Sequence, residues 1–349
     1  MHNGDIKDLY EEMLIKKIKD EKSFFYFCSY VPVEIIHASS YKPVRFILDS
    51  MQFLHSDEVI PKYICPYLKT AVEFFIKNNL KEKNIIFTDG CDSSRRIFEV
   101  FKELNFTKKY FYLKIPFNEN PQDVLFFKSE LQELFLLLNG KIDLEKLNES
   151  INLYNSGRKK LYQIFNNKSQ NLKSSFKFYL NSLFQLMDIE DFINLDIDFT
   201  NQKNEIQNKF YLFSTVYPLN FIEYIESLGI NIEYDDSCFG EKNLSLIELN
   251  KDDPLTSISE YYLKREGCVR KREIDKKLEN LIQRYKNKNL KGVIIYNLKY
   301  CDPLIFFIPM IKEKLNEEKI PLLMIEDDFT MNIKGQIRTR IEAFLEMMI

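Results

Sequence analysis

Histidine is scarce in this sequence, and the cysteines form no closely spaced pair. The 349 residues include only His2, His37 and His55, so a zinc or di-iron site built on imidazole ligands is poorly supplied. None of the six cysteines belongs to a C-x-x-C motif. A metal centre in this protein would therefore depend on sulfur ligands that the fold brings together from distant positions.

The sequence also lacks the common motifs of nucleotide binding and hydrolysis. It contains no G-x-G-x-x-G after a predicted strand, no phosphate-binding loop of the form G-x-x-x-x-G-K-S/T, no G-x-S-x-G and no H-E-x-x-H. Dinucleotide binding, ATP hydrolysis through a phosphate-binding loop, serine hydrolysis and zinc-dependent proteolysis therefore lack their usual parts. If the activity needs ATP, another protein must hydrolyse it.

Charge and apolar runs give no sign of nucleic acid or a membrane as a partner. The 49 basic and 52 acidic residues are mixed along the chain and leave a formal net charge of −3, so no basic surface for a phosphate backbone is expected. No apolar run approaches the ~18 residues of a membrane span, and the charged N-terminal stretch lacks the apolar core of a signal peptide. We expect a cytoplasmic protein whose cysteines are free thiols or metal ligands.

The residues that are present predict two globular α/β halves. The length of 349 residues and an apolar content of 45% are typical of two folded domains. In the first half, short buried-strand patterns alternate with helical spacing, which predicts a βαβ unit and a parallel sheet. The predicted strands are Ser23–Val31, Asn84–Asp89 and Lys109–Ile115, and the predicted helices cover 5–22, 67–80 and the segment from Cys91 to Leu104.

A helical middle separates this half from a second one. Residues 121–195 carry long helical patterns, and the polar stretch Asn201–Asn208 is typical of a linker. Strands are then predicted at Phe210–Ser214, Ile230–Asp235, Gly292–Leu298 and Pro321–Glu326, with helices near 218–228, 255–288 and 304–316. We therefore predict a first α/β domain over 1–120, a helical insert over 121–203 and a second, doubly wound α/β domain over 204–349.

Four of the six cysteines stand at strand ends or helix starts, where ligands bind in parallel α/β proteins. Cys91, Cys238 and Cys301 each follow a predicted strand, and Cys65 opens the helix predicted near 67–80. Three thiolates at such positions can hold a [4Fe–4S] cluster, and inert buried thiols are the alternative interpretation. Cys28 lies inside the predicted strand Ser23–Val31, which favours a buried structural thiol.

The segments around the cysteines resemble the 2-hydroxyacyl-CoA dehydratase family. This family includes the D-components of such dehydratases, benzoyl-CoA reductase subunits and double-cubane cluster proteins. Seven segments match in order and span both ends of the chain, which leaves mainly the helical middle unmatched. They are YVPVEIIHASSYKPVRF (30–46), ICPYLKTA (64–71), FTDGCDSSRRIFEVF (87–101), YDDSCFG (234–240), NLKYCDPLIFFIP (297–309), IPLLMIEDD (320–328) and GQIRTRIEAFLEMM (335–348).

The resemblance implies two Rossmann- or flavodoxin-like domains with an iron–sulfur cluster between them. The ligands of a [4Fe–4S] cluster would be Cys65, Cys91 and Cys301. The segment of Cys238 lines the same region in the family without supplying a usual ligand, and Cys268 is expected to be structural. For the double-cubane proteins, the cofactor would instead be an [8Fe–9S] double cubane.

The activity that the resemblance implies is the removal of water from an (R)-2-hydroxyacyl-CoA to give a 2-enoyl-CoA. The β-hydrogen of such a thioester is not acidic. In the family, a low-potential electron on the carbonyl gives a ketyl radical, which expels the hydroxyl group and acidifies the β-proton. An ATP-hydrolysing iron–sulfur activator protein supplies the electron. The enzyme resembles a heterodimer of related subunits, and the short length of this chain favours the iron–sulfur subunit that relays the electron in this hydro-lyase.

The resemblance also implies four further site residues. Glu34 would face the cluster and substrate region, and its alternative role is to cap the helix after Pro32. Ser39 or Ser40 would hydrogen-bond the thioester or a cluster sulfide. Gln336 would point N–H groups at the cluster or the substrate from the start of the final helix, and a plain helix start is the alternative.

Two departures from the family pattern leave substrate binding open. Family members often have a glycine where this chain has Ser39 and Ser40, and an arginine where it has Glu241 and Lys242. Two other functions are therefore kept as hypotheses. One is a double-cubane reductase of small molecules that uses no CoA ester, and the other is a degenerate relative that binds or scaffolds without enzymatic activity.

Overall fold

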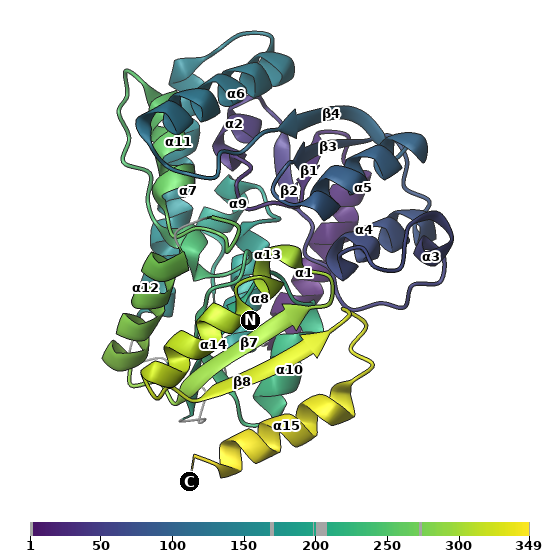
Figure 1. Cartoon of the computed structure of the whole chain (residues 1–349). Coiled ribbons are helices and arrows are strands. Elements are labelled where there is room, and N and C mark those ends of the chain that lie inside the picture. The colour runs from purple at the N-terminus through teal and green to yellow at the C-terminus, as the bar shows by residue number, and fades with distance from the viewer. Residues whose placement is uncertain (1–2, 168–170, 198, 200–207, 272–273, 349) are drawn as a thin grey trace.

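Two parallel β-sheets form the frame of the protein (Figure 1). The computed structural model describes residues 3–167, 171–197, 199, 208–271 and 274–348. Each sheet has four parallel strands, in the order β2-β1-β3-β4 in the first and β6-β5-β7-β8 in the second. The chain therefore enters both sheets in the same order. The predicted fold, two doubly wound parallel α/β halves, is confirmed.

The first sheet is built from short, mostly apolar strands. Ile85 and Ile86 at its centre are fully buried, as expected for a sheet covered on both faces. The edge strand β2 was not predicted, because it is short and contains Pro43, a residue that edge strands tolerate. The strands are β1 Ser23–Tyr26, β2 Lys42–Arg45, β3 Lys83–Thr88 and β4 Thr107–Leu113. The predicted strand Ser23–Val31 is thus too long, since β1 ends at Tyr26.

The second sheet agrees closely with its predicted strands. Its central strand β7 is buried along its whole length, which matches its continuous apolar sequence GVIIYNL. The strands are β5 Lys209–Ser214, β6 Asn231–Asp235, β7 Gly292–Leu298 and β8 Leu322–Asp327. The predicted linker 201–208 lies outside the described residues except for Asn208.

Two helices of the first half, α2 (Val33–Ala38) and α5 (Asp92–Glu103), contact strands of the first sheet. Pro66 occupies the first turn of α4, a position that needs no backbone N–H donor. Cys65 and Cys91 are the residues that precede α4 and α5. The helices are α1 Asn3–Lys19, α2 Val33–Ala38, α3 Ser56–Val59, α4 Pro66–Lys77 and α5 Asp92–Glu103.

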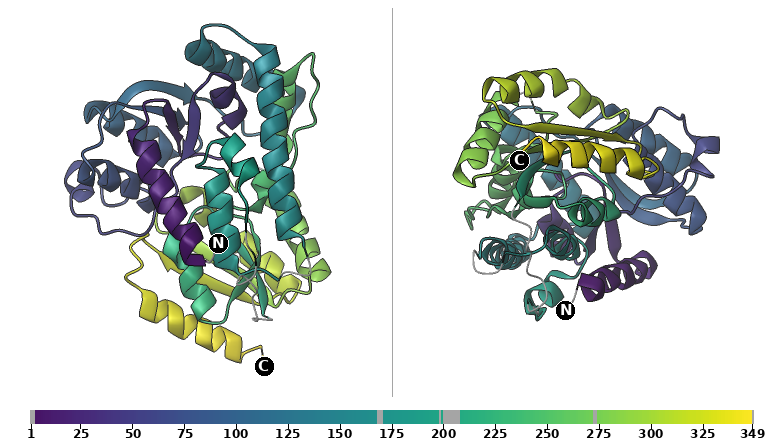
Figure 2. Two further views of the ribbon diagram at one scale, coloured as in Figure 1. Left: turned by 180° about the vertical axis from the view of Figure 1, so that it is seen from behind. Right: turned by 90° about the horizontal axis from the view of Figure 1, so that it is seen from below.

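The middle of the chain is helical, as predicted. The described residues between 121 and 195 form α6 Pro121–Asn139, α7 Leu144–Phe165, α8 Ser174–Phe184 and α9 Ile189–Asn194. Helix α7 packs on α2 of the first half, and α8 packs on α10 (Leu219–Ser227) of the second. Figure 2 shows α1, α8 and the long α7 side by side on the back of the molecule. The middle helices thus contact both sheet-bearing halves, and the predicted domain boundaries stay a prediction.

The single long helix predicted near 255–288 is wrong. The structure has α11 Pro254–Lys264 and α12 Ile274–Asn287, with an irregular segment between them. Arg265 has extended backbone angles, φ −61° and ψ 162°, and ends the first helix. Its guanidinium donates to the carbonyl of Ser29 and, over 3.0 Å, to Oδ1 of Asn243. These bonds to distant segments hold the chain out of the helical path.

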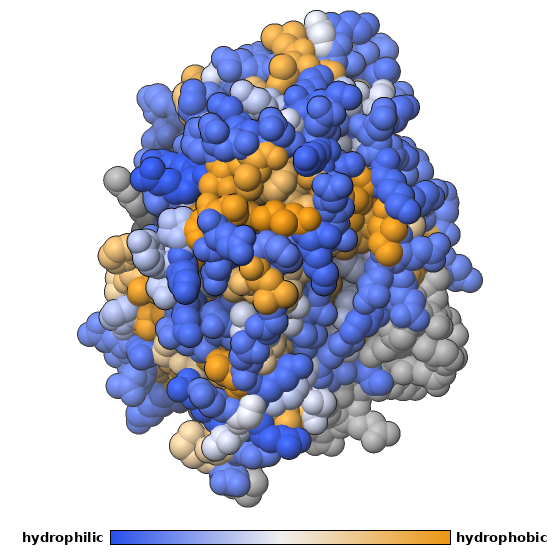
Figure 3. All heavy atoms as spheres, turned by 90° about the vertical axis from the view of Figure 1, so that its right-hand side faces the viewer, coloured by the Kyte–Doolittle hydropathy of each residue, from blue (hydrophilic) through white to orange (hydrophobic). Residues whose placement is uncertain are grey.

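The remaining elements complete the second half and its surface. They are the 3₁₀ helix η1 Glu241–Leu244, α13 Asp302–Ile305, α14 Ile308–Glu317 and α15 Lys334–Glu346. No helix in the described part of the chain is long and apolar enough to cross a membrane. In Figure 3 the surface is mostly hydrophilic, with apolar side chains gathered near the middle of the face shown.

Candidate functional site

All six cysteines line one pocket, which we call the cysteine pocket. Its cavity volume is about 110 Å³. Every one of these cysteines is free of disulfide bonds. They come from six separate segments of both halves: Cys28, Cys65, Cys91, Cys238, Cys268 and Cys301. The cysteines are far apart in the sequence, and the fold therefore brings every thiol of the chain to one place.

Three of these residues, Cys65, Cys91 and Cys301, are here called the first triad, and each one directly precedes a helix. The backbone N–H of Ser94 donates to Sγ of Cys91 over 3.4 Å. Sγ of Cys301 lies 3.3 Å from Oγ1 of Thr215. The sulfurs thus face the free N–H groups that helix starts provide, or a neighbouring hydroxyl group.

Burial sets the protonation state of the first triad. It raises the pKa of Cys65, Cys91 and Cys301 to about 12 in each case. A neighbouring thiol raises the pKa further: Cys91 acts on Cys65, and Cys65 acts on Cys301. These three residues are therefore neutral thiols at neutral pH, and a metal centre would have to displace their protons to bind.

The other three cysteines, Cys28, Cys238 and Cys268, are here called the second triad, and they lie on irregular segments. Cys28 follows β1 instead of lying within it, so the prediction of a cysteine inside a buried strand is wrong. Cys268 lies in the break between α11 and α12 and also lines the pocket. Cys28 and Cys268 therefore reach the pocket through irregular segments that the sequence patterns did not predict, whereas Cys238 follows β6 as predicted.

Within the second triad, one thiol is acidified by another. A hydrogen bond from the thiol of Cys238 lowers the pKa of Cys268 to about 6, and the positive charge of Lys242 contributes to the same shift. The same hydrogen bond raises the pKa of Cys238 well above its ordinary value. At neutral pH the pair therefore holds one thiolate and one thiol.

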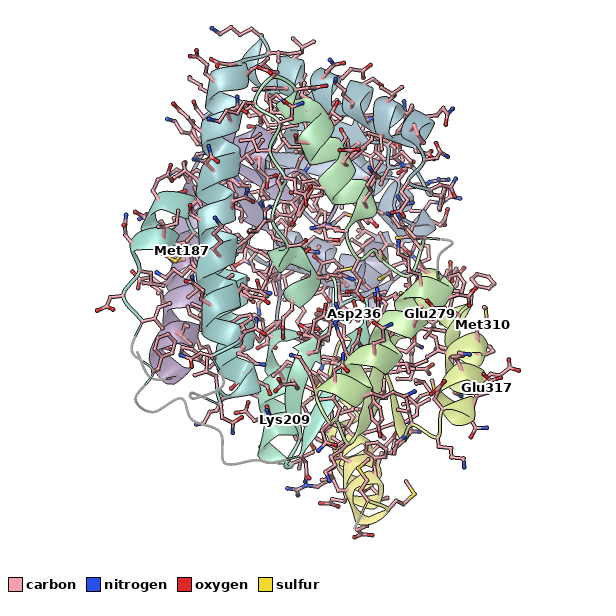
Figure 4. The ribbon with its side chains drawn as sticks, turned by 90° about the vertical axis from the view of Figure 1, so that its left-hand side faces the viewer. Met187, Lys209, Asp236, Glu279, Met310 and Glu317 are labelled. Atoms are coloured by element: carbon pink, nitrogen blue, oxygen red, sulfur yellow. The ribbon has the colours of Figure 1, made fainter. Side chains whose placement is uncertain are left out.

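Buried charges support the loop that carries Cys238. Asp236 is fully buried, and its carboxylate lies 3.7 Å from Nζ of Lys242 and 2.5 Å from Nζ of Lys277. Figure 4 labels Asp236 and shows it beside α12, the helix of Lys277. The backbone N–H of Cys238 donates to the carbonyl of Thr215 over 2.7 Å. Lys242 thus places a positive charge in the region where the family often has an arginine.

The turn after Cys238 requires a glycine. A Cβ atom on Gly240 would lie 2.0 Å from the backbone oxygen of Asp235, a distance that no real Cβ contact allows. The carboxylate of Asp235 accepts hydrogen bonds from the hydroxyl of Tyr217 and the backbone N–H of Ser237. The chain therefore folds back tightly on itself beside the second triad.

The rest of the pocket wall presents mostly apolar surface, and its lining residues also include one arginine, Arg270, and two aspartates, Asp92 and Asp302. Phe27, Leu68 and Val216 lie between the cysteines. Arg270 is 8% exposed, and its guanidinium donates to the carbonyls of Ile115 and Pro116. An apolar wall excludes water and strengthens every charge interaction inside the pocket.

The structure places Glu34 and Ser39 away from the cysteine pocket. Glu34 is fully buried, forms an ion pair with Arg158 and accepts a hydrogen bond from the hydroxyl of Tyr262 over 2.9 Å. The hydroxyl of Ser39 donates to the carbonyl of Ile35 at the end of α2. Neither residue lines the pocket, and their predicted catalytic roles stay predictions.

Ser40 and Gln336 are also separated from the cysteines. Ser40 lines a different, wider cavity of about 540 Å³ beside α2 and α7. Its φ of 61° lies in the left-handed region, which favours glycine, and this agrees with the glycine often found there in the family. Gln336 is exposed on α15 and does not line the cysteine pocket. The structure thus brings together the three predicted ligands but not the other predicted site residues.

The donor set fits a cluster better than a single ion. Among the described residues, no group of three or more His, Cys, Asp or Glu side chains is arranged to hold one metal ion. All six thiols nevertheless line the same pocket. In an iron–sulfur cluster each ligated iron takes its own thiolate, so the ligands surround the group instead of meeting at one point.

Fold and site together define a protein of two parallel α/β halves with a thiol-lined pocket. The sequence model of the 2-hydroxyglutaryl-CoA dehydratase D-component (HGD-D) matches residues 28–348. The match covers more than half of the chain, and the protein belongs to this family. All six cysteines of the pocket lie within the matched region.

Three relatives are similar over nearly the full length of the chain. One of the subunits of the benzoyl-CoA reductase of Thauera aromatica is 26% identical over 328 residues, which cover 86% of this chain and 84% of the relative. The (R)-phenyllactyl-CoA dehydratase beta subunit of Clostridium sporogenes is 22% identical and covers 98% and 97%. The putative dehydratase subunit YjiM of Escherichia coli (strain K12) is 22% identical and covers 92% and 90%. All three are named as subunits of enzymes.

Proposed function

We propose that this chain is the iron–sulfur, electron-relaying subunit of an enzyme that dehydrates an (R)-2-hydroxyacyl-CoA to a 2-enoyl-CoA. The observation that carries the proposal is the convergence of six free thiols on one pocket with a largely apolar wall. Soft sulfur donors select iron–sulfur clusters over hard cations, and the six thiols outnumber the two carboxylates, Asp92 and Asp302, that also line the pocket. A cluster bound there would supply a low-potential one-electron carrier.

The first triad is proposed to hold a [4Fe–4S] cluster. The backbone N–H groups of Tyr67 and Leu68 donate to the sulfur of Cys65, and that of Ser94 donates to Cys91. Such donors stabilise negative charge on sulfur and so tune the reduction potential of a bound cluster. The largely apolar wall limits the access of water.

The substrate is proposed to bind mainly on a related partner subunit. Glu34, Ser39 and Ser40 are the residues that the resemblance connects with the substrate, and none of them lines the cysteine pocket. Two of the three relatives named above are subunits of acyl-CoA enzymes. An ATP-dependent iron–sulfur activator is proposed as the electron donor, because this sequence has no ATP-binding loop. Free thiols fit a reducing, cytoplasmic location.

Metal analysis of the full-length protein tests the proposal. After strictly anaerobic purification, the protein should contain about four irons and as many labile sulfides per chain if the first triad alone binds a cluster. Dehydration of a 2-hydroxyacyl-CoA should then require the partner subunit, the activator and ATP together. A colourless protein without iron after anaerobic reconstitution would contradict the proposal and leave the non-enzymatic hypothesis.

A second candidate function is a double-cubane reductase of small molecules. The observation that favours it is the second triad, which places three more thiols in the same pocket. Six thiolates can serve two cubanes with three ligands each, whereas a single cubane leaves the second triad unused. This function predicts about eight irons per chain and activity without a CoA ester. A content of about four irons per chain would eliminate it.

A further inference from the structure

A second cavity lies directly behind the wall of the cysteine pocket. Its volume is about 30 Å³, and three arginines line it: Arg45 from β2, Arg158 from α7 and Arg265 after α11. No aspartate or glutamate is among the described residues that line it. Ser29 lines both cavities, so the two share part of a wall.

Arg45 is buried among neutral acceptors. It is 2% exposed, and its Nη1 donates to Oε1 of Gln185 over 2.8 Å and to the carbonyl of Cys238 over 2.6 Å. Its Nη2 donates to the carbonyl of Phe27 over 3.3 Å. Its Nε is buried and has no hydrogen-bond partner. No carboxylate is paired with this charge among the ion pairs of the described residues.

Of the other two guanidiniums, only that of Arg158 is paired with a carboxylate. Arg158 is 3% exposed and is paired with the carboxylate of Glu34, and its Nε has no hydrogen-bond partner. Arg265 donates to the carbonyl of Ser29 and to Oδ1 of Asn243, which are both neutral. Burial of a cation is costly unless an anion compensates it. Two of the three positive charges around this cavity therefore lack a carboxylate partner.

The three guanidiniums also act on the pKa of one residue, Tyr26. Burial raises the pKa of the Tyr26 hydroxyl to about 12. The charges of Arg45, Arg265 and Arg158 lower this pKa, and the charge of Glu34 raises it. Tyr26 itself lines the cavity. The positive potential of all three arginines therefore converges on this small space, and does not spread over separate parts of the surface.

We propose that this cavity binds a small inorganic monoanion of the size of chloride or nitrate, held by Arg45, Arg158 and Arg265. A water-sized sphere needs about 10–15 Å³, so the space suits an anion of one to a few atoms. The unpartnered Nε–H groups of Arg45 and Arg158 are available donors, and guanidinium groups bind oxyanions and halides through such donors. The site is separate from the proposed cluster and does not depend on it.

Anion binding would also stiffen the cysteine pocket. Arg45 holds the carbonyl of Cys238, and Arg265 holds the carbonyl of Ser29 next to Cys28. An anion that draws the two guanidiniums together would fix both loops of the second triad. The test can therefore be made on the full-length protein without iron, where failure of this proposal leaves the proposed function untouched.

Thermal unfolding in different sodium salts tests the site. At constant ionic strength adjusted with gluconate, the melting temperature should begin to rise near the dissociation constant of nitrate or chloride and then increase with the logarithm of its concentration. A ligand that binds only the folded state stabilises it in this way by mass action. Nitrate has no general stabilising effect of the kind that sulfate has. Arg265→Met should weaken the apparent affinity about tenfold or more.

Arg284→Met is the matched control. Arg284 pairs with Glu266 over 2.7 Å, and its guanidinium lies 4.1 Å from the ring centre of Tyr234, but it does not line the cavity. This variant should keep the wild-type dependence of the melting temperature on nitrate concentration. No rise with nitrate or chloride relative to gluconate, or a response that is the same in wild type and Arg265→Met, would overturn the proposal.

A crystallographic measurement covers the case in which Arg265→Met does not fold. Wild-type crystals grown in sodium bromide should show an anomalous bromide peak between Arg45, Arg158 and Arg265. A cavity without such a peak at saturating bromide would overturn the proposal.

Discussion

The first and second triads line the same pocket, but the protein holds them by different means. The first triad precedes regular helices, and burial raises the pKa of all three thiols to about 12. The second triad lies on irregular segments, where Cys238 and Lys242 lower the pKa of Cys268 to about 6. The first set is positioned by the parallel α/β fold itself. The second set is positioned by long side chains that reach across the molecule.

Arg45 and Arg265 are the clearest examples of this second kind of support. Arg45 donates to the carbonyls of Phe27 and Cys238, which lie in different halves of the chain and meet at one guanidinium. Arg265 donates to the carbonyl of Ser29, and the same residue ends α11 just before Cys268. The comparison teaches that regular elements supply one half of the pocket, and that irregular loops fixed through arginine supply the other.

The largest expected effect is on iron content, which should depend on the first triad and not on the second. Cys91→Ser should lower the iron content of anaerobically purified protein from about four per chain to near zero, because a [4Fe–4S] cluster held by three thiolates is lost with one of them. The measurement is iron and labile sulfide per chain. Cys28→Ser is the matched variant from the second triad, and it should keep about four irons if the first triad alone binds a cluster. Full iron in Cys91→Ser would contradict the ligand assignment.

The next effect tests the tight turn that supports the second triad. Gly240→Ala should reduce the free energy of unfolding by about 3 kcal/mol, since a new Cβ would collide with the backbone oxygen of Asp235. Denaturant unfolding measures this change. Gly335→Ala is the control, because that glycine in α15 has no atom within 4 Å of an added Cβ, and alanine there should stabilise the helix by up to about 1 kcal/mol. Equal stabilities of the two variants would argue against a strained turn.

The smallest effect concerns the acidified thiol. In protein without iron, Cys268 should react with iodoacetamide as a thiolate above about pH 6, whereas the first triad stays protonated far above neutral pH. Cys238→Ala removes the hydrogen bond that lowers the pKa of Cys268, so the pKa rises and labelling at pH 7 should slow about tenfold or more. Peptide mass spectrometry follows the site and the rate.

Cys65→Ala serves as the control for this labelling experiment. Cys65 is not among the groups that shift the pKa of Cys268. The variant should label at the wild-type rate and with the same dependence on pH. A slower rate in both variants would mean that access to the pocket, not protonation, controls the reaction.

Much of the fold was predictable because it depends on local patterns. Continuous apolar runs such as GVIIYNL identify buried parallel strands, and Cys65, Cys91 and Cys301 could be placed because strand ends and helix starts are local features. Strand β2 escaped prediction, since four residues with Pro43 leave too weak a pattern.

Cys238 was placed correctly after a predicted strand, but the positions of Cys28 and Cys268 escaped prediction because their causes are not local. The apolar run Ser23–Val31 has the composition of a longer strand, but beyond Tyr26 the carbonyls of Phe27 and Ser29 bind guanidinium groups instead of a neighbouring strand. Cys268 was placed inside a long helix for the same reason, since nothing in the charged segment 255–288 shows that Arg265 reaches Ser29. A pattern along the chain does not contain contacts between residues that are so distant in the sequence.

Iron and labile sulfide per chain, measured after strictly anaerobic purification of the full-length protein, test the central claim most directly. We predict a brown protein with iron and sulfide in equal amounts, about four of each if the first triad alone is used and about eight if both triads are. A protein that stays colourless and free of iron after anaerobic reconstitution would contradict the proposed iron–sulfur role.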